Sequence, residues 1–485
     1  MKNSQPTHDH KHSPNRFAVI PTHVRLDADP NFQGKGVTIA FLDSGFYSHA
    51  DLVEPVSRVL AFKDVTGETN SLVSREMTES WRWHGTQTSV VAAGNGQLSD
   101  GVYKGLASEA QLVLVKVSEN GRISEGNIAR GIEWAIENRQ RYNIRVLNLS
   151  LGGEEDVPCS NSIIDQAAEE AISQGIVVVA AAGNSGGAGS HSIPPANSPS
   201  VITVGGYTDS NQLKGSGLDL YHSNFGVTAD GIVKPEIVAP AMWVAAPIPP
   251  GTPSYDRAEG LSRLAAAADY QLPSLARELE EAAQLPEAIV VAEPAEIRRF
   301  VESVLSAERI VAAHYQHVDG TSFAAPIVSS IVAQMIEANP EITPGAVKNI
   351  LISSANRIAS APAIRQGYGV VSARRAVELA KGERHDLNGR GCNPPRVDNG
   401  RLVFVYHDDR AHSVSLAGDF NDWAQQRTPL SKDKSGLWLA EIPAPGPGSY
   451  RYKYVIDGHR WLEDPSNGMK VSDNYGGLNS LLVIE

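Results

Sequence analysis

The sequence predicts an α/β domain with a three-layer parallel sheet, followed by a small all-β sandwich. Three observations lead to this prediction. Up to about residue 380, apolar β-prone runs alternate with segments of helical periodicity. Residues 381–396 are rich in Gly, Asn, Pro and charge without periodicity, which is typical of a linker. Residues 397–485 contain short alternating strands separated by Gly and Pro turns.

The α/β domain, residues 33–380, begins with the run Val37–Leu42, which is nearly all apolar and β-prone. Such a run is expected for a strand that is covered on both faces. Similar runs follow at residues 111–117, 146–151, 177–182 and 201–206, and apolar residues at helical spacing occupy 128–135 and 163–172. This alternation predicts right-handed crossovers and helices on both faces of a parallel sheet.

Three motifs in this domain carry residues suited to nucleophilic catalysis. Asp43 follows the first strand, His84 precedes a helix of small residues, and Ser322 opens an apolar helix after a Gly-Thr turn. The start of a helix favours negative charge, and the glycine allows close approach of a substrate backbone. A serine hydroxyl needs a base in hydrogen-bond reach, itself oriented by a third group. We therefore predict Ser322 as nucleophile, His84 as base and Asp43 as the orienting carboxylate.

The order Asp, His, Ser, with these motifs, resembles the subtilisin-like serine peptidases (subtilases, S8 family). Val146–Gly153 resembles the family's substrate-binding strand, and Val177–Gly186 resembles its oxyanion segment. The resemblance implies an endopeptidase that needs no cofactor for its chemistry, although subtilases commonly need structural calcium. Carried over by position, it implies further site residues: Asn184 as oxyanion donor, Ser150, Leu151 and Gly152 along the substrate pocket, and Pro195 at a frequent cis-proline position.

Several residues and one long segment depart from the usual pattern of that family. Gln87-Thr88-Ser89 follows the His motif, and Phe323 and Ile327 replace a common methionine and histidine; we expect these residues to affect packing rather than chemistry. The loop Asn95–Asp100 offers oxygen ligands, but the sequence does not supply a full set for calcium. Residues 251–312 form a helical insertion, interpreted as a surface element or as a lid or docking element.

Residues 397–485 resemble the glycogen-binding module of AMP-activated kinase β subunits (carbohydrate-binding family 48), and the predicted sandwich is immunoglobulin-like. The resemblance rests on Gly418–Trp423, Tyr452–Gly458, Trp461–Pro465 and Gly477–Asn479. It implies that Trp423 and Trp461 stack on sugar rings while Lys453 and Asn479 bond hydroxyls. Indole faces suit the C–H face of a pyranose. The alternative is a sandwich whose tryptophans belong to its core.

The composition narrows the partners and the location. The net charge of −13 argues against a nucleic-acid partner. Residues 1–14 are polar without an apolar core, so the sequence predicts no secretory signal, no membrane partner and a cytoplasmic protein. Cys159 and Cys392 are then expected to be reduced thiols. In the N-terminal arm, residues 1–32, Phe17–Pro21 suits either a strand laid into the cleft or a simple packing strand.

These observations together predict an intracellular serine endopeptidase that acts on protein or peptide substrates and is tethered to glycogen or another α-glucan. One alternative is a cytosolic peptidase whose β-sandwich serves only structure or protein docking. A third hypothesis is a glycan-binding scaffold without catalysis, although the intact set of Asp43, His84, Asn184 and Ser322 argues against it. The side-chain preference of the substrate pocket cannot be assigned, because no charged residue is evidently placed at its base.

Overall fold

The structure is a computed structural model, and it divides the chain into two compact units. One unit contains residues 245–317, called here the inserted unit, together with Val19 at the start of the described chain; the other contains the described parts of residues 20–244 and 318–485. The described residues are 19–69, 71–72, 83–153, 156–186, 191–213, 217–250, 252–382, 395–398, 400–408, 411–432, 437–464, 467, 470–473 and 478–484.

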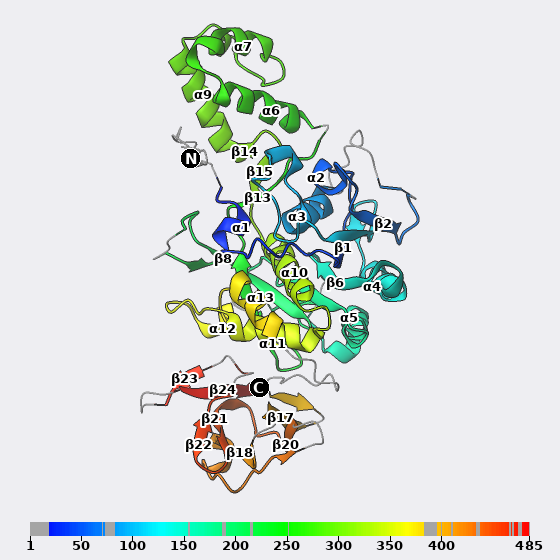
Figure 1. The fold of residues 1–485 in the computed structure, drawn as a ribbon, viewed down its shortest axis with the longest axis vertical. Coiled ribbons are helices and arrows are strands. Elements are labelled where there is room, and N and C mark those ends of the chain that lie inside the picture. Colours follow the sequence, from blue (N-terminus) through cyan, green and yellow to red (C-terminus); the bar gives the residue numbers. More distant parts are fainter. Residues whose placement is uncertain are drawn as a thin grey trace, which may run out of the picture. The chain divides into compact units, whose positions relative to one another are not determined.

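A parallel sheet forms the centre of the first domain, as predicted (Figure 1). Its strand order is β12-β8-β7-β6-β1-β3-β2, with β9 antiparallel to β8. The strands are β1 (Thr38–Asp43), β2 (Val59–Asp64), β3 (Gln111–Lys116), β6 (Ile144–Leu149), β7 (Val177–Ala181), β8 (Ile202–Thr208), β9 (Asp219–Leu220) and β12 (Ile237–Pro240). Every residue of β1 is buried, which explains its unbroken apolar composition.

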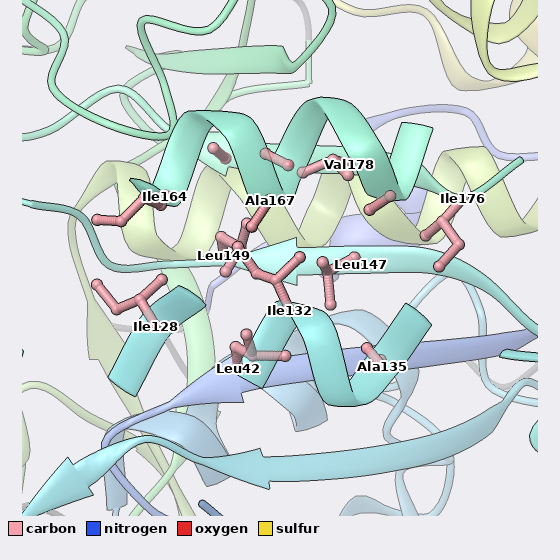
Figure 2. Packing of buried hydrophobic residues seen from close by; sticks show 14 of the residues in the cluster. Leu42, Ile128, Ile132, Ala135, Leu147, Leu149, Ile164, Ala167, Ile176 and Val178 are labelled. Atoms are coloured by element: carbon pink, nitrogen blue, oxygen red, sulfur yellow. The ribbon is translucent and has the colours of Figure 1, made fainter. Parts of the chain in front are cut away.

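Helices cover both faces of this sheet and complete the three layers. The helices are α1 (Thr22–Arg25), α2 (Ala50–Val53), α3 (Trp83–Ala93), α4 (Glu125–Tyr142), α5 (Ile163–Ser173), α10 (Thr321–Ala338), α11 (Pro344–Ser354), α12 (Ala363–Gln366) and α13 (Ala373–Gly382). In Figure 2, Ile132 of α4 and Ala167 of α5 pack against Leu147 and Leu149 of β6. On the opposite face, Ser329 of α10 donates a hydrogen bond to Asn148 of β6 at 2.9 Å.

Two local features explain how these helices begin and where α10 belongs. Ser124 caps α4 and Ser162 caps α5, each side chain accepting a backbone N–H three residues ahead. In the described part of the chain, α10 alone is long and apolar enough for a membrane span. Since 83% of it is buried inside the fold, we interpret it as a core helix.

The inserted unit is helical, as predicted, and has a hydrophobic core of its own. Its elements are β13 (Val244–Pro247), α6 (Pro253–Ala266), α7 (Leu272–Glu278), α8 (Glu287–Val290), α9 (Pro294–Ala307), β14 (Ile310–Ala312) and β15 (Tyr315–Val318). Leu261 and Leu264 of α6 pack with Ile297, Val301 and Leu305 of α9. The three strands form a small sheet in the order β13-β15-β14. A separate core indicates a small domain rather than a long surface loop.

The C-terminal part contains two antiparallel sheets, as predicted for a sandwich. One has the order β16-β17-β20-β19, and the other has the order β18-β21-β24-β23 with β22 beside β21. The strands are β16 (Arg396–Asp398), β17 (Arg401–His407), β18 (Val414–Gly418), β19 (Ser431–Lys432), β20 (Leu437–Pro443), β21 (Gly448–Ile456), β22 (Arg460–Leu462), β23 (Lys470–Ser472) and β24 (Leu478–Ile484). Phe404 of one sheet and Tyr452 of the other meet in a shared core.

Short elements complete the described chain. They are the strands β4 (Ser118–Glu119), β5 (Arg122–Ile123), β10 (Gly226–Val227) and β11 (Val233–Lys234), and the 3-10 turns at 97–99, 159–161, 269–271 and 419–421. The predicted linker 381–396 falls mostly outside the described residues, as do Cys392 and the Phe17-Ala18 part of the N-terminal arm. Cys159 is a free thiol, and burial raises its pKa to about 11, which makes it unreactive.

Candidate active site

Asp43 is the last residue of β1, in the middle of the parallel sheet, where ligand sites of α/β folds occur. Its carboxylate is buried but well supplied with donors. The backbone N–H of Ser44 donates to Oδ1 at 2.7 Å, and the hydroxyl of Thr88 lies 3.3 Å from Oδ2. These donors fix the orientation of the carboxylate, so Asp43 is suited to hold a neighbouring base.

His84 is the second residue of α3, and its Nδ1 lies 2.8 Å from Oδ1 of Asp43. Gly85 makes this approach possible, because a Cβ there would lie 2.8 Å from the Cβ of Asp43. Burial alone would lower the pKa of His84, but the charge and the hydrogen bond of Asp43 outweigh it and raise the pKa above its ordinary value. The hydrogen bond to Asp43 also fixes which nitrogen carries the proton, leaving Nε2 as the base.

Ser322 is the second residue of α10, directly after a turn that only glycine tolerates well. Gly320 has φ of +139°, a conformation that side chains rarely adopt. Among the described residues, the Ser322 hydroxyl has one hydrogen-bond acceptor, the carbonyl of Ser150 at 3.5 Å, and it is not bonded to His84. The ring of Phe323 lies 5.9 Å from the ring of His84, so the start of α10 borders the histidine.

Asn184 follows β7 and is exposed beside the start of α10. Its Oδ1 accepts two hydrogen bonds from Thr321, one from the backbone N–H at 2.8 Å and one from the hydroxyl at 3.0 Å. The same hydroxyl accepts the backbone N–H of Gly183 at 3.2 Å. Because Oδ1 is occupied, the amide is held in one orientation, and its Nδ2, which has no acceptor among the described residues, can donate to an anionic oxygen.

The three pocket residues follow β6 directly. The Ser150 hydroxyl donates to the carbonyl of Ser322 at 2.8 Å, which joins the predicted substrate strand to the nucleophile helix. Leu151 is half-buried and packs against the core below the sheet. Gly152 is exposed, and a Cβ there would lie 2.9 Å from the carbonyl of Pro194. The Pro194-Pro195 peptide bond is cis, as the resemblance implied.

The four predicted sugar-binding residues lie on one face of the sheet β18-β21-β24-β23. Trp461 pairs with Val455, and Lys453 lies two residues from Val455 on the same face. Ser480 pairs with Tyr452, whose side chain points to the core, so the preceding residue Asn479 lies on the face of Lys453. The rings of Trp423 and Trp461 stack with centroids 6.4 Å apart, and Trp461 is 40% exposed. These four residues therefore lie on the side of this sheet that faces away from the sandwich core.

Two of these four side chains are less open than the tryptophans. The ammonium of Lys453 pairs with Asp473 at 2.8 Å, which uses one of its three donors. Asn479 is 5% exposed and so presents little surface to a ligand in this conformation. Trp438 differs from the exposed pair, because it is buried and its indole donates to the carbonyl of Asp408 at 2.9 Å. Core and surface tryptophans are thus both present.

Comparison with known proteins adds to this geometry. A model of the subtilase family matches residues 34–370, more than half of the chain. The chain belongs to the subtilase family. A model of carbohydrate-binding module 48 (isoamylase N-terminal domain) matches residues 391–476 of this subtilase.

Two relatives show how far the similarity extends. Serine protease AprX of Bacillus subtilis (strain 168) is 29% identical over 354 residues, covering 71% of this subtilase and 66% of AprX. Subtilisin Savinase of Lederbergia lenta is 35% identical over 201 residues, covering 41% of this subtilase and 65% of Savinase. The chain thus spans slightly less than two thirds of either relative.

Among solved structures, fervidolysin from Fervidobacterium pennivorans, a keratinolytic enzyme related to subtilisin, has a similar fold. The match has a TM-score of 0.50 at 18% identity and covers 87% of this subtilase and 53% of fervidolysin. It supports the fold alone.

The structure also shows residues that the sequence did not single out. Thr321 orients Asn184, although it was visible only as the middle residue of the Gly-Thr-Ser turn. Thr88 was expected to affect packing, whereas its hydroxyl contacts the carboxylate of Asp43. Asn224 accepts the backbone N–H of Ser185 at 2.7 Å and so holds the oxyanion segment. No local pattern distinguishes Asn224, because its partner lies far away in sequence.

Part of the loop Asn95–Asp100, the candidate for a calcium site, is engaged in hydrogen bonds in this subtilase. Oδ1 of Asn95 accepts the backbone N–H of Gln97 at 3.0 Å, and the carboxylate of Asp51 accepts that of Leu98 at 3.1 Å. Within the described residues, no group of three or more His, Cys, Asp or Glu side chains could hold a metal ion. The Asn95 side-chain oxygen is engaged within the loop, and we assign no metal to it.

Proposed function

We propose that this subtilase is an intracellular serine endopeptidase, with Ser322 as nucleophile, His84 as general base and then acid, Asp43 as the orienting group and Asn184 as the oxyanion donor. The observation that carries this proposal is the Asp43–His84 pair at 2.8 Å beside the start of α10. In this pair, the buried carboxylate of Asp43 binds one nitrogen of His84, and the other nitrogen remains available to the helix that carries Ser322.

The reaction follows from these positions. His84 Nε2 takes the proton of the Ser322 hydroxyl as the oxygen attacks the carbonyl carbon of a peptide bond. The oxyanion that forms accepts a hydrogen bond from Nδ2 of Asn184, and Asp43 stabilises the protonated imidazole. His84 then gives the proton to the leaving amine, and water releases the acyl group by the same steps. The Ser322–His84 hydrogen bond is expected to form once substrate is bound, since such bonds are often long in free enzymes.

Labelling with a fluorophosphonate, read by intact mass, tests this assignment. We expect one adduct on the wild type and none on Ser322→Ala. His84→Ala should slow labelling strongly while leaving the fold intact, which circular dichroism can verify. If the full-length protein takes no adduct, the peptidase function is refuted and the glycan-binding scaffold becomes the better hypothesis.

We further propose that the β-sandwich binds glycogen or another α-glucan through Trp423 and Trp461. Their stacked, partly exposed rings on the outer face support this, because a pyranose packs its C–H face on an indole. Among the described residues, the Lys453 ammonium bonds only Asp473, which leaves donors that could bond sugar hydroxyls. Tethering would raise the local concentration of granule-bound protein substrates without changing the chemistry.

Co-sedimentation with glycogen tests the tether. We expect wild type to pellet with glycogen and Trp461→Ala to stay in solution. Leu439→Ala is a matched control, because Leu439 is 39% exposed on the other sheet of the sandwich. If wild type and Trp461→Ala pellet equally poorly, the sandwich is structural or docks protein. Cell fractionation tests the location: recovery outside the cell would contradict an intracellular, glycogen-bound enzyme.

A further inference from the structure

The turn that presents Ser322 is fastened to a second segment, Ala241–Trp243, which follows β12. The backbone N–H of Gly320 donates to the carbonyl of Ala241 at 2.8 Å. The backbone N–H of Trp243 donates to Oδ1 of Asp319 at 3.3 Å. The two residues before Thr321 are therefore held by this segment, while Thr321 itself is held by Asn184.

The segment is strained at Trp243, which has φ of +59°. A bulky residue in the left-handed region is a genuine outlier, and such strain persists only where the surroundings fix the backbone. Residues held in this way are found mostly at functional sites. The contact of this segment with the turn before Ser322 explains why the strained conformation is kept.

Arg25, at the end of α1, supplies that constraint from the N-terminal side. Its guanidinium donates to the carbonyl of Met242 at 2.9 Å and to Oδ1 of Asn211 at 3.1 Å. Its Nε lies 3.3 Å from the carboxylate of Asp209, and the two side chains are only 3% and 6% exposed. Asn211 also accepts the backbone N–H of Ile20 at 2.8 Å. One planar cation thus joins the start of the described chain to the segment that holds the nucleophile turn.

We propose that Arg25 is a positioning residue for Ser322, acting through Met242 and the Ala241–Trp243 segment. The inference rests on the proposed function, in which Ser322 is the nucleophile. A guanidinium is needed because its planar fork donates to Met242 and Asn211 at fixed positions while its charge pairs with Asp209, a geometry that an ammonium cannot reproduce. In this role the segment from Ile20 to Arg25 belongs to the active structure, and removing it would lower activity rather than release it.

The test compares Arg25→Met and Arg25→Lys with wild type in the full chain. Arg374→Met is the matched control, because Arg374 also pairs with the N-terminal segment, at Asp27 (2.8 Å), but on the surface and away from the turn. Active sites are first counted by fluorophosphonate titration, so that unfolded molecules do not affect the rates. Peptide hydrolysis and hydrogen–deuterium exchange of the peptide that contains Gly320 are then measured.

We expect kcat per titrated site to fall about tenfold in Arg25→Met, the effect of one lost hydrogen bond on a rate, with KM within about twofold. The kcat of Arg25→Lys should lie between those of wild type and Arg25→Met, and the kcat of Arg374→Met should match wild type. The Gly320 amide should exchange faster only in the Arg25 variants. An unchanged kcat in Arg25→Met, or an equal fall in Arg374→Met, would overturn the proposal. If wild type takes no label, the peptidase function fails instead, and unchanged exchange at Gly320 would still refute the link.

Discussion

Thr321 offers a direct test of how Asn184, the proposed oxyanion donor, is held. Replacing it with valine keeps the shape of the side chain but removes the hydroxyl that lies 3.0 Å from Oδ1 of Asn184 and 3.2 Å from the backbone nitrogen of Gly183. The backbone N–H of residue 321 would still hold Oδ1 at 2.8 Å. The variant therefore loosens Asn184 without removing it.

The expected effect is intermediate between no change and loss of the donor. One hydrogen bond contributes about 1–1.5 kcal/mol, which corresponds to roughly a tenfold fall in kcat. Deleting an oxyanion donor outright costs about 100- to 1,000-fold. Thr321→Val should thus lower kcat about tenfold and Asn184→Ala about a hundredfold or more. Thr321→Ser, which keeps the hydroxyl, should stay close to wild type.

The assay is hydrolysis of a peptide amide, with rates normalised to active sites titrated by fluorophosphonate. The decisive variant is the double mutant Asn184→Ala, Thr321→Val. If Thr321 acts through Asn184, its replacement should cost nothing further once Asn184 is absent. A full tenfold fall in the double mutant as well would refute the reasoning and indicate a direct or a purely structural role of the hydroxyl.

Three further predictions concern single positions. Asp43→Asn should lower kcat by about 10,000-fold by misplacing the imidazole proton. Because Asp43 raises the pKa of His84, the acid limb of the pH–rate profile should move to lower pH in this variant. An acid limb that does not move would contradict the pairing. Gly85→Ala should lower activity at least tenfold, since the added methyl forces α3 away from Asp43, and wild-type activity would refute this contact. Asp165→Asn should stabilise the fold more at pH 8 than at pH 5, by about 2 kcal/mol, measured by thermal unfolding.

The sign of the Asp165 effect follows from its surroundings. Burial raises the pKa of its carboxyl to about 7, and neither buried oxygen has a hydrogen-bond partner among the described residues. The folded state therefore disfavours the charged form. The cost begins above the ordinary pKa of 3.8 and is complete above about 7. If Asp165→Asn changed the free energy of unfolding equally at both pH values, ionisation of Asp165 would not destabilise the folded state.

The sequence predicted the parallel sheet and the Asp43, His84 and Ser322 motifs because these depend on short-range patterns. A buried strand that ends in a carboxylate and a Gly-Thr turn that opens an apolar helix are both visible within a few residues. The contacts that tune them are not. Thr88 lies one turn of helix from His84, and its contact with Asp43 becomes evident only when α3 is placed against β1.

The sandwich shows a different limit. The alternating runs at 402–406, 413–416, 450–456 and 480–484 predict four strands close to β17, β18, β21 and β24, but no such run marks β20. Alternation in β20 is blurred, because Leu439 is apolar yet points outward while Trp438 points into the core. Likewise, the sequence indicated three tryptophans in this domain but could not separate the buried Trp438 from the exposed Trp461. That distinction depends on which face of a strand meets the other sheet.

The chain enters the inserted unit after Val244 and leaves it before Val318, and the adjacent residues Trp243 and Asp319 are hydrogen-bonded at 3.3 Å. The α/β domain already holds the two ends of the inserted unit together. The inserted unit therefore adds little loop-closure entropy to the folding of that domain. Because the inserted unit has a hydrophobic core of its own, it can also unfold separately. Calorimetry should then show two unfolding transitions. Evolution or engineering could replace the inserted unit without changing the parallel sheet that carries the proposed catalytic residues.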